Sequence, residues 1–153
     1  MNDTEKIAMI KEELERAKVG KHKCSDPNCF ISMALPLLEL EGSFDSVADL
    51  VLFCYEQRQN LEKEGIVIGG EAIVDIEENQ VKQAVDELLI FGENIKENSP
   101  MKKPWTSLVL SAQKNREAIK ALIFFANFFV MLEKGHYVVK RKEAIVKAIL
   151  AAK

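Results

Sequence analysis

Histidine, cysteine and tryptophan are scarce in this chain of 153 residues, which contains two histidines, three cysteines and one tryptophan. No nucleophile and base can be paired from the sequence with any specificity. Gly69-Gly70 lacks the lysine and the hydroxyl residue that a phosphate-binding loop requires. We therefore expect neither an enzyme nor a bound cofactor.

Long hydrophobic runs are also missing. The most apolar stretch, Ala121–Leu132, has 12 residues, whereas crossing a bilayer takes about 20. Residues 1–18 contain several acidic side chains and no apolar run after a basic start, so they do not resemble a targeting signal. Together with the odd cysteine count, this predicts a cytoplasmic protein with free thiols and no membrane contact.

Apolar residues recur at helical spacing along most of the chain, in a composition that is 48% hydrophobic and 29% charged. The length suits one domain, so we predict a single helical domain over residues 1–153. The fold class is all-α, a bundle of five or six helices. The residues around Gly69-Gly70, 66–74, predict either a short β-hairpin or an extended connector. The predicted helices cover Thr4–Lys18, Asp26 to Gly42 with a kink or break at Pro36, Phe44–Lys63, Asp75 to Asn98, Thr106–Lys134 and Val139–Ala152.

Capping residues suggest where several of these helices begin. Asp26, followed by proline, predicts a helix start, and Asp75 with Glu78 has the spacing of a capping box. Thr106 is a plausible N-cap, with Trp105 before it positioned to pack on Leu110.

The stretch HKCSDPNC, residues 22–29, groups two of the three cysteines with one of the two histidines. His22, Cys24 and Cys29 are candidate zinc ligands, but a structural zinc site takes four ligands. In a first helical turn, the Cys29 thiol would have a lowered pKa, and Cys24 could pair with it on oxidation. The alternative is a polar loop that leads into a helix. Cys54 lies on an apolar face and is expected to be a core residue.

Charge is divided unevenly along the chain. Residues 1–98 carry 10 Lys/Arg against 21 Asp/Glu, a balance of −11, and residues 99–153 carry 11 against 3, a balance of +8. Cations interleaved with aromatic rings can follow a phosphate backbone and stack on bases. The candidate residues for a nucleic acid or an acidic partner are Lys102, Lys103, Trp105, Lys114, Arg116, Tyr137, Lys140, Arg141, Lys142 and Lys147.

Three hypotheses follow for the function. The first is a non-enzymatic interaction module, or a subunit of a larger assembly, that binds a protein partner or a second copy of itself through complementary acidic and basic surfaces. The second is a nucleic-acid-binding subunit that uses the basic third. The third is a metal or redox switch built on the cysteines and histidine of residues 22–29. The basic residues could also lie against acidic helices of the same chain.

Overall fold

A computed structural model describes residues 2–23, 29–63 and 75–134, and every regular element in these ranges is helical. The predicted all-α fold is therefore confirmed. The predicted hairpin at 66–74 and the last predicted helix lie outside the described residues. The elements are α1 (Asp3–Lys18), α2 (Phe30–Met33), α3 (Leu35–Leu38), α4 (Phe44–Lys63), the short 3₁₀ helix η1 (Glu78–Gln80), α5 (Val81–Glu93), α6 (Lys102–Ser111) and α7 (Arg116–Lys134).

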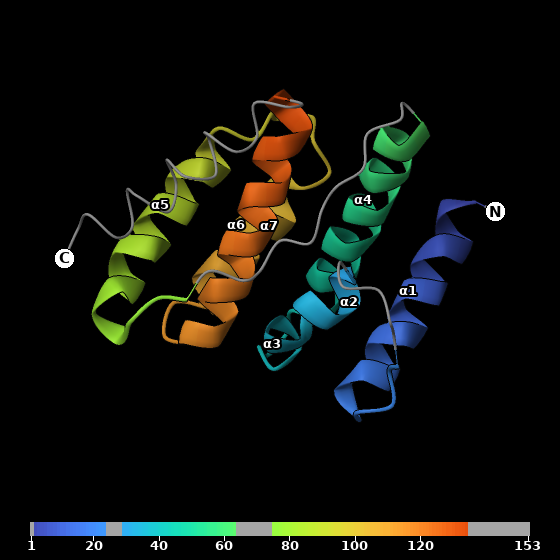
Figure 1. Cartoon of the computed structure of the whole chain (residues 1–153), viewed down its shortest axis with the longest axis horizontal. Coiled ribbons are helices and arrows are strands. Elements are labelled where there is room, and N and C mark those ends of the chain that lie inside the picture. Colours follow the sequence, from blue (N-terminus) through green and yellow to red (C-terminus); the bar gives the residue numbers. More distant parts are fainter. Residues whose placement is uncertain (1, 24–28, 64–74, 135–153) are drawn as a thin grey trace.

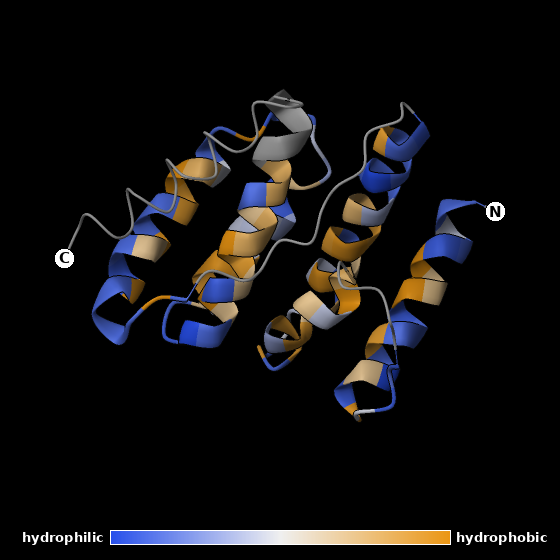
Figure 2. Ribbon diagram, viewed as in Figure 1, coloured by the Kyte–Doolittle hydropathy of each residue, from blue (hydrophilic) through white to orange (hydrophobic). Residues whose placement is uncertain are grey.

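The long helices lie side by side in a bundle, with α1 and α5 on opposite flanks (Figure 1). Helix α1 contacts α4, and α4 also contacts α6. On the other flank, α5 contacts both α6 and α7, while the short α3 lies against α7. Figure 2 shows that α1 and α5 turn their hydrophobic sides inward and their hydrophilic sides to solvent.

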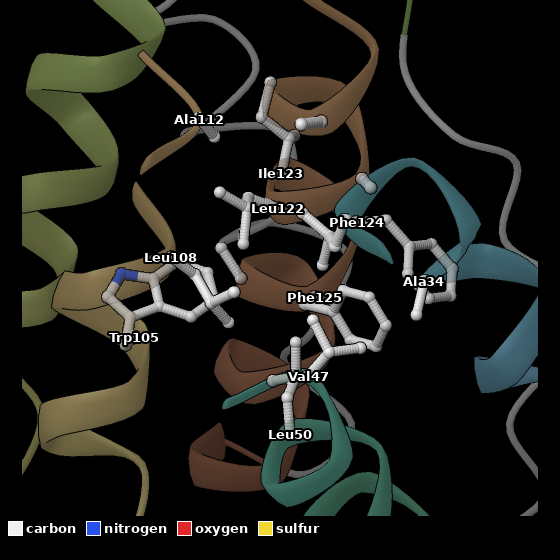
Figure 3. Packing of buried hydrophobic residues seen from close by; sticks show 14 of the residues in the cluster. Ala34, Val47, Leu50, Trp105, Leu108, Ala112, Leu122, Ile123, Phe124 and Phe125 are labelled. Atoms are coloured by element: carbon white, nitrogen blue, oxygen red, sulfur yellow. The ribbon is translucent and has the colours of Figure 1, made fainter. Parts of the chain in front are cut away.

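Helix α7 supplies the centre of the core. From Ala118 to Phe129, every residue except the half-buried Lys120 is buried. Such an apolar helix is stable only when other elements surround it. Figure 3 shows α6 and α4 contributing Trp105 and Val47 to the packing around it. Phe30, at the start of α2, completes this packing with a ring contact to Phe128 at 4.9 Å between centroids.

The predicted helix Thr106–Lys134 is wrong, because the structure divides it. Helix α6 begins before Thr106, at Lys102, and ends at Ser111. The Asn115 side chain accepts a hydrogen bond from the backbone N–H of Ala118 at 3.1 Å and starts α7. Trp105 consequently lies inside α6, and Leu110 is 50% exposed, so the predicted staple between these residues does not form.

The start of the second predicted helix also differs. Cys29 is extended, with φ −68° and ψ 113°, and serves as the N-cap of α2, so it does not lie in a first helical turn. Asp26 itself lies outside the described residues. The break at Pro36 is confirmed, because α2 ends at Met33 and the proline lies at the start of α3. Proline has no N–H to continue the helix.

The capping box before α5 occurs at Glu77 and Gln80, two residues after the predicted pair. The Gln80 side-chain oxygen accepts from the Glu77 N–H at 2.7 Å. Asp75 instead forms an ion pair with Lys120 of α7. The predicted helix Phe44–Lys63 coincides with α4. The first helix begins one residue earlier than predicted, at Asp3, with Asn2 as its N-cap.

Candidate thiol site

Three side chains form a connected polar chain at one end of α1. The Nδ1 atom of His22 lies 3.1 Å from a Glu13 carboxylate oxygen. Its Nε2 atom lies 3.3 Å from the sulfur of Cys29. The imidazole thus bridges a carboxylate and a thiol, which is the order of groups that orients and charges a nucleophilic cysteine.

The turn after α1 brings His22 back over Glu13. Helix α1 ends at Lys18, and Gly20 follows with φ +73°, a conformation that glycine adopts without a steric penalty. The Lys21 N–H returns to the Arg16 carbonyl at 2.8 Å, which satisfies one of the free carbonyls at the helix end. Chain reversal at this glycine therefore positions the imidazole.

Helix α4 encloses the sulfur from the other side. The hydroxyl oxygen of Tyr55 lies 3.5 Å from Cys29 Sγ. The Tyr55 ring meets the Phe30 ring edge to face at 5.0 Å, and the guanidinium of Arg58 lies 5.0 Å from both ring centroids. These contacts fix the tyrosine, so its hydroxyl is held beside the thiol.

The surroundings of Cys29 favour its thiolate. Burial by itself would raise the pKa, but hydrogen bonds from the Tyr55 hydroxyl, from the Ser32 backbone and hydroxyl and from His22 lower the pKa of the Cys29 thiol to about 6. The hydrogen bond to Cys29 raises the pKa of His22, more than burial lowers it, and Glu13 raises it further. Burial and the contact with Cys29 raise the pKa of Tyr55, so its hydroxyl stays protonated and can donate.

A Cys29 thiolate paired with a His22 imidazolium is compatible with each hydrogen bond among Glu13, His22 and Cys29. Both ring nitrogens of a protonated His22 donate, one to the Glu13 carboxylate and one to the Cys29 sulfur. Glu13 also accepts from Arg16 at 2.7 Å, which holds the carboxylate in place. The site can therefore keep an activated sulfur near neutral pH.

Cys54 provides a contrast on the neighbouring helix α4. It has no exposed surface, and burial raises the pKa of its thiol well above the ordinary value, against a smaller effect of Arg58. It is the core residue that the sequence predicts.

Within the described residues, no group of three or more His, Cys, Asp or Glu side chains could hold a metal ion. Glu13 and Cys29 contact opposite nitrogens of His22, so the three do not converge on one point. Cys24 lies outside the described residues, so the proposed zinc set of His22, Cys24 and Cys29 stays a prediction.

The described candidate residues of the basic third differ in their surroundings. Trp105 is 1% exposed, and its indole N–H donates to the Leu88 carbonyl at 2.9 Å. Arg116 lies 3.6 Å from Glu78, and Lys102 lies 3.4 Å from Glu97. Lys103 and Lys114 are exposed. The other candidates, Tyr137, Lys140, Arg141, Lys142 and Lys147, lie outside the described residues.

Sequence reasoning missed Glu13 and Tyr55. Glu13 looks like a solvated helix residue, and Tyr55 follows Cys54 on α4 without a motif. No sequence pattern marks these two residues, because they lie 42 positions apart and come together only where α1 packs against α4. The scarcity of histidine and cysteine was the one local clue, and it identified the other two members of the site.

None of the described helices is long and apolar enough to span a bilayer. No protein-family model, curated protein or solved structure matched this chain.

Proposed function

We propose that the protein is a thiol-based redox switch in which Cys29 is oxidised by a small hydroperoxide. The observation that carries this proposal is the position of the Cys29 sulfur, within 3.3 Å of His22 Nε2 and 3.5 Å of the Tyr55 hydroxyl. A thiolate held by two donors is the reactive form of cysteine toward peroxides.

Burial decides which kind of reaction suits this sulfur. Cys29 is 2% exposed, so a peptide or another large substrate cannot approach it in this conformation. Hydrogen peroxide is close to water in size and needs far less room. The site therefore supports oxidation by a small molecule over acyl transfer to a protein or peptide.

The reaction balances with the groups present and a peroxide. The Cys29 thiolate attacks one peroxide oxygen, the O–O bond breaks, and the sulfur becomes a sulfenic acid. The departing hydroxide takes the proton on Nε2 of His22 and leaves as water. Glu13 stabilises the imidazolium before the transfer and keeps the ring oriented during it.

The sequence suggests a second step. Cys24 lies five residues before Cys29, and its thiol would attack the sulfenic sulfur to form a disulfide, with a second molecule of water released. Because Cys24 lies outside the described residues, this step is predicted from the sequence alone.

The test is treatment with hydrogen peroxide, removal of the peroxide, unfolding in denaturant that contains dimedone, which traps sulfenic acids, and then peptide mass spectrometry. Dimedone is expected on Cys29 in the Cys24→Ser variant, and a Cys24–Cys29 disulfide is expected in the parent. The Cys54→Ala variant is the matched control and should behave as the parent does. Equal, slow oxidation of all three cysteines would exclude the proposal.

A protein-interaction role remains the second candidate. Its support is that the acidic and basic parts of the chain already pair within one molecule, at Lys120–Asp75 and Arg116–Glu78. The same complementarity would serve contacts between copies. Light scattering after size-exclusion chromatography at low and high salt tests it, because a monomer at both salt concentrations that engages no partner excludes it.

A further inference from the structure

A second feature, separate from the thiol site, is a cavity of about 180 Å³ formed by α4, α5, α7 and the segment that joins α5 to α6. It has an apolar interior and a polar rim. A cavity of about 150 Å³ in another protein core admits benzene, so this one has room for a single aromatic ring with a short substituent. Its lining consists of Phe53, Phe91, Ile95, Lys96, Ser99, Met101 and Phe129.

Three phenylalanine rings form the apolar wall. The rings of Phe91 and Phe129 are nearly parallel, at 13° and 6.3 Å between centroids. Phe53 meets Phe129 edge to face at 5.5 Å. A flat ring entering the cavity would find both ring faces and ring edges, and aromatic contacts of both kinds are favourable beyond the area they bury.

Two polar groups stand at the rim. Lys96 is exposed, and no described carboxylate forms an ion pair with its ammonium. The neighbouring Glu97 is paired with Lys102 at 3.4 Å. Ser99 accepts the Met101 N–H at 3.2 Å through its hydroxyl oxygen, which leaves the hydroxyl proton for another acceptor. An ammonium and a hydroxyl donor that line the same cavity suit a carboxylate.

We propose that this cavity binds a small aromatic monocarboxylate, with its ring among Phe53, Phe91 and Phe129 and its carboxylate at Lys96 and Ser99. The assignment is supported by the size of the cavity, its aromatic wall and a rim that offers donors to an anion. It does not depend on the redox chemistry of Cys29.

Trp105 makes the proposal easy to test, because it is the single tryptophan of the chain. Its ring lies 5.3 Å from Phe91 and 5.5 Å from Phe129. Occupation of the cavity will therefore change its fluorescence. Titration with phenylacetate is expected to give a saturable change at millimolar concentrations, and calorimetry should give the same dissociation constant.

Phenylacetamide is the matched probe, since it has the same ring and nearly the same size but no charge. An exposed ion pair contributes modestly, so phenylacetamide should bind about two- to fivefold more weakly. Lys96→Gln should remove this preference by weakening phenylacetate alone. Lys103→Gln removes another exposed lysine, one that does not line the cavity, and should keep the preference.

A variant that fills the cavity, Ile95→Phe, should abolish binding of both probes while its melting temperature shows that it folds. Saturable binding that survives in folded Ile95→Phe would locate the ligand elsewhere and overturn the proposal. Equal affinity of the parent for acid and amide would overturn the role of Lys96. Tighter binding of octanoate than of phenylacetate would overturn the aromatic assignment, and absence of saturation by both aromatic probes would overturn the site.

Discussion

The imidazole of His22 lies 3.3 Å from the sulfur of Cys29, through its Nε2 atom. The two residues are separated by a segment with a proline and belong to no common helix. Their contact depends on the turn at Gly20 and on the extended backbone of Cys29 before α2. The charge state of this pair has two measurable consequences.

The first consequence is an acidic thiol. Titration of the ultraviolet absorbance of the thiolate should show a transition near pH 6 that is absent from Cys29→Ser. His22→Gln should move the midpoint upward, because the amide donates without a charge. Tyr55→Phe should raise it at least as far, since the tyrosine hydroxyl contributes more to lowering the pKa. A single transition near the ordinary thiol value of about 8.5 in the parent would contradict the assignment.

The second consequence concerns stability. The pKa of Cys29 is lower in the folded state than in the unfolded chain, so the folded state releases its proton first as pH rises. The stabilisation from this group is complete above the ordinary thiol pKa and is lost as pH falls through about 6. The difference in unfolding free energy between the parent and Cys29→Ala, measured by urea denaturation, should therefore grow from about pH 5 to about pH 7.

Cys54→Ala supplies the control for this measurement. Burial raises the pKa of Cys54 well above the ordinary value, so its thiol keeps its proton in both states across that range. Its effect on the unfolding free energy should be constant with pH. A pH-independent difference for Cys29→Ala as well would show that the thiol does not ionise in the folded protein.

Helical periodicity was sufficient to predict the fold class. The stripe of Val47, Leu50, Val51 and Cys54 is buried as the spacing requires, and α4 has the predicted bounds. The helix boundaries between Ser111 and Arg116 were missed because the polar run between them contains neither proline nor glycine, the residues that most often mark a helix end. The break depends on a local hydrogen bond from the Ala118 N–H to Asn115, which competes with a continuous helix.

The candidate site was predictable only in part. The scarcity of His22 and Cys29 marked them, but their partners come from α1 and α4, and packing brings these helices together. For Trp105, the neighbouring residues in the sequence led to a wrong prediction. Its neighbours in sequence include Lys102 and Lys103, which suggested an exposed aromatic residue, whereas the structure places the ring in the core. Charge near a residue in sequence does not determine the direction of its side chain.

The close contact between α5 and α6 predicts the effect of a small substitution. A methyl group at Gly92 would lie 2.8 Å from Cδ1 of Trp105, and the indole is held by its bond to the Leu88 carbonyl. Overpacking of a core typically costs about 1–3 kcal/mol, and alanine in a helix recovers about 1 kcal/mol relative to glycine. Gly92→Ala should therefore destabilise the protein by about 1 kcal/mol in chemical denaturation.

A double-mutant cycle isolates this contact. Trp105→Phe replaces the indole with a smaller ring, so Gly92→Ala should cost less in that background than in the parent. Equal cost in both backgrounds would show that the added methyl group meets something other than the indole.

The last prediction concerns the use of a positive charge inside the fold. The ammonium of Lys102 donates to the carbonyls of Gly92, Glu93 and Ile95 at 2.9, 3.0 and 3.0 Å. These carbonyls belong to the last turn of α5 and the residues that follow it, where the helix dipole favours a cation. Lys102→Gln can keep one of these hydrogen bonds but loses the charge, so we expect it to destabilise the protein by about 1–2 kcal/mol.

Lys103→Gln is the matched control, because Lys103 is exposed and adjacent in sequence; its effect should stay within about 0.5 kcal/mol. If thermal and urea denaturation give the two variants the same stability, the three carbonyl contacts do not stabilise the end of α5. A larger loss of stability in Lys102→Gln than in Lys103→Gln would mean that Lys102 holds α5 and α6 together. This cation of the basic third would then not be available as a freely solvated charge for a partner.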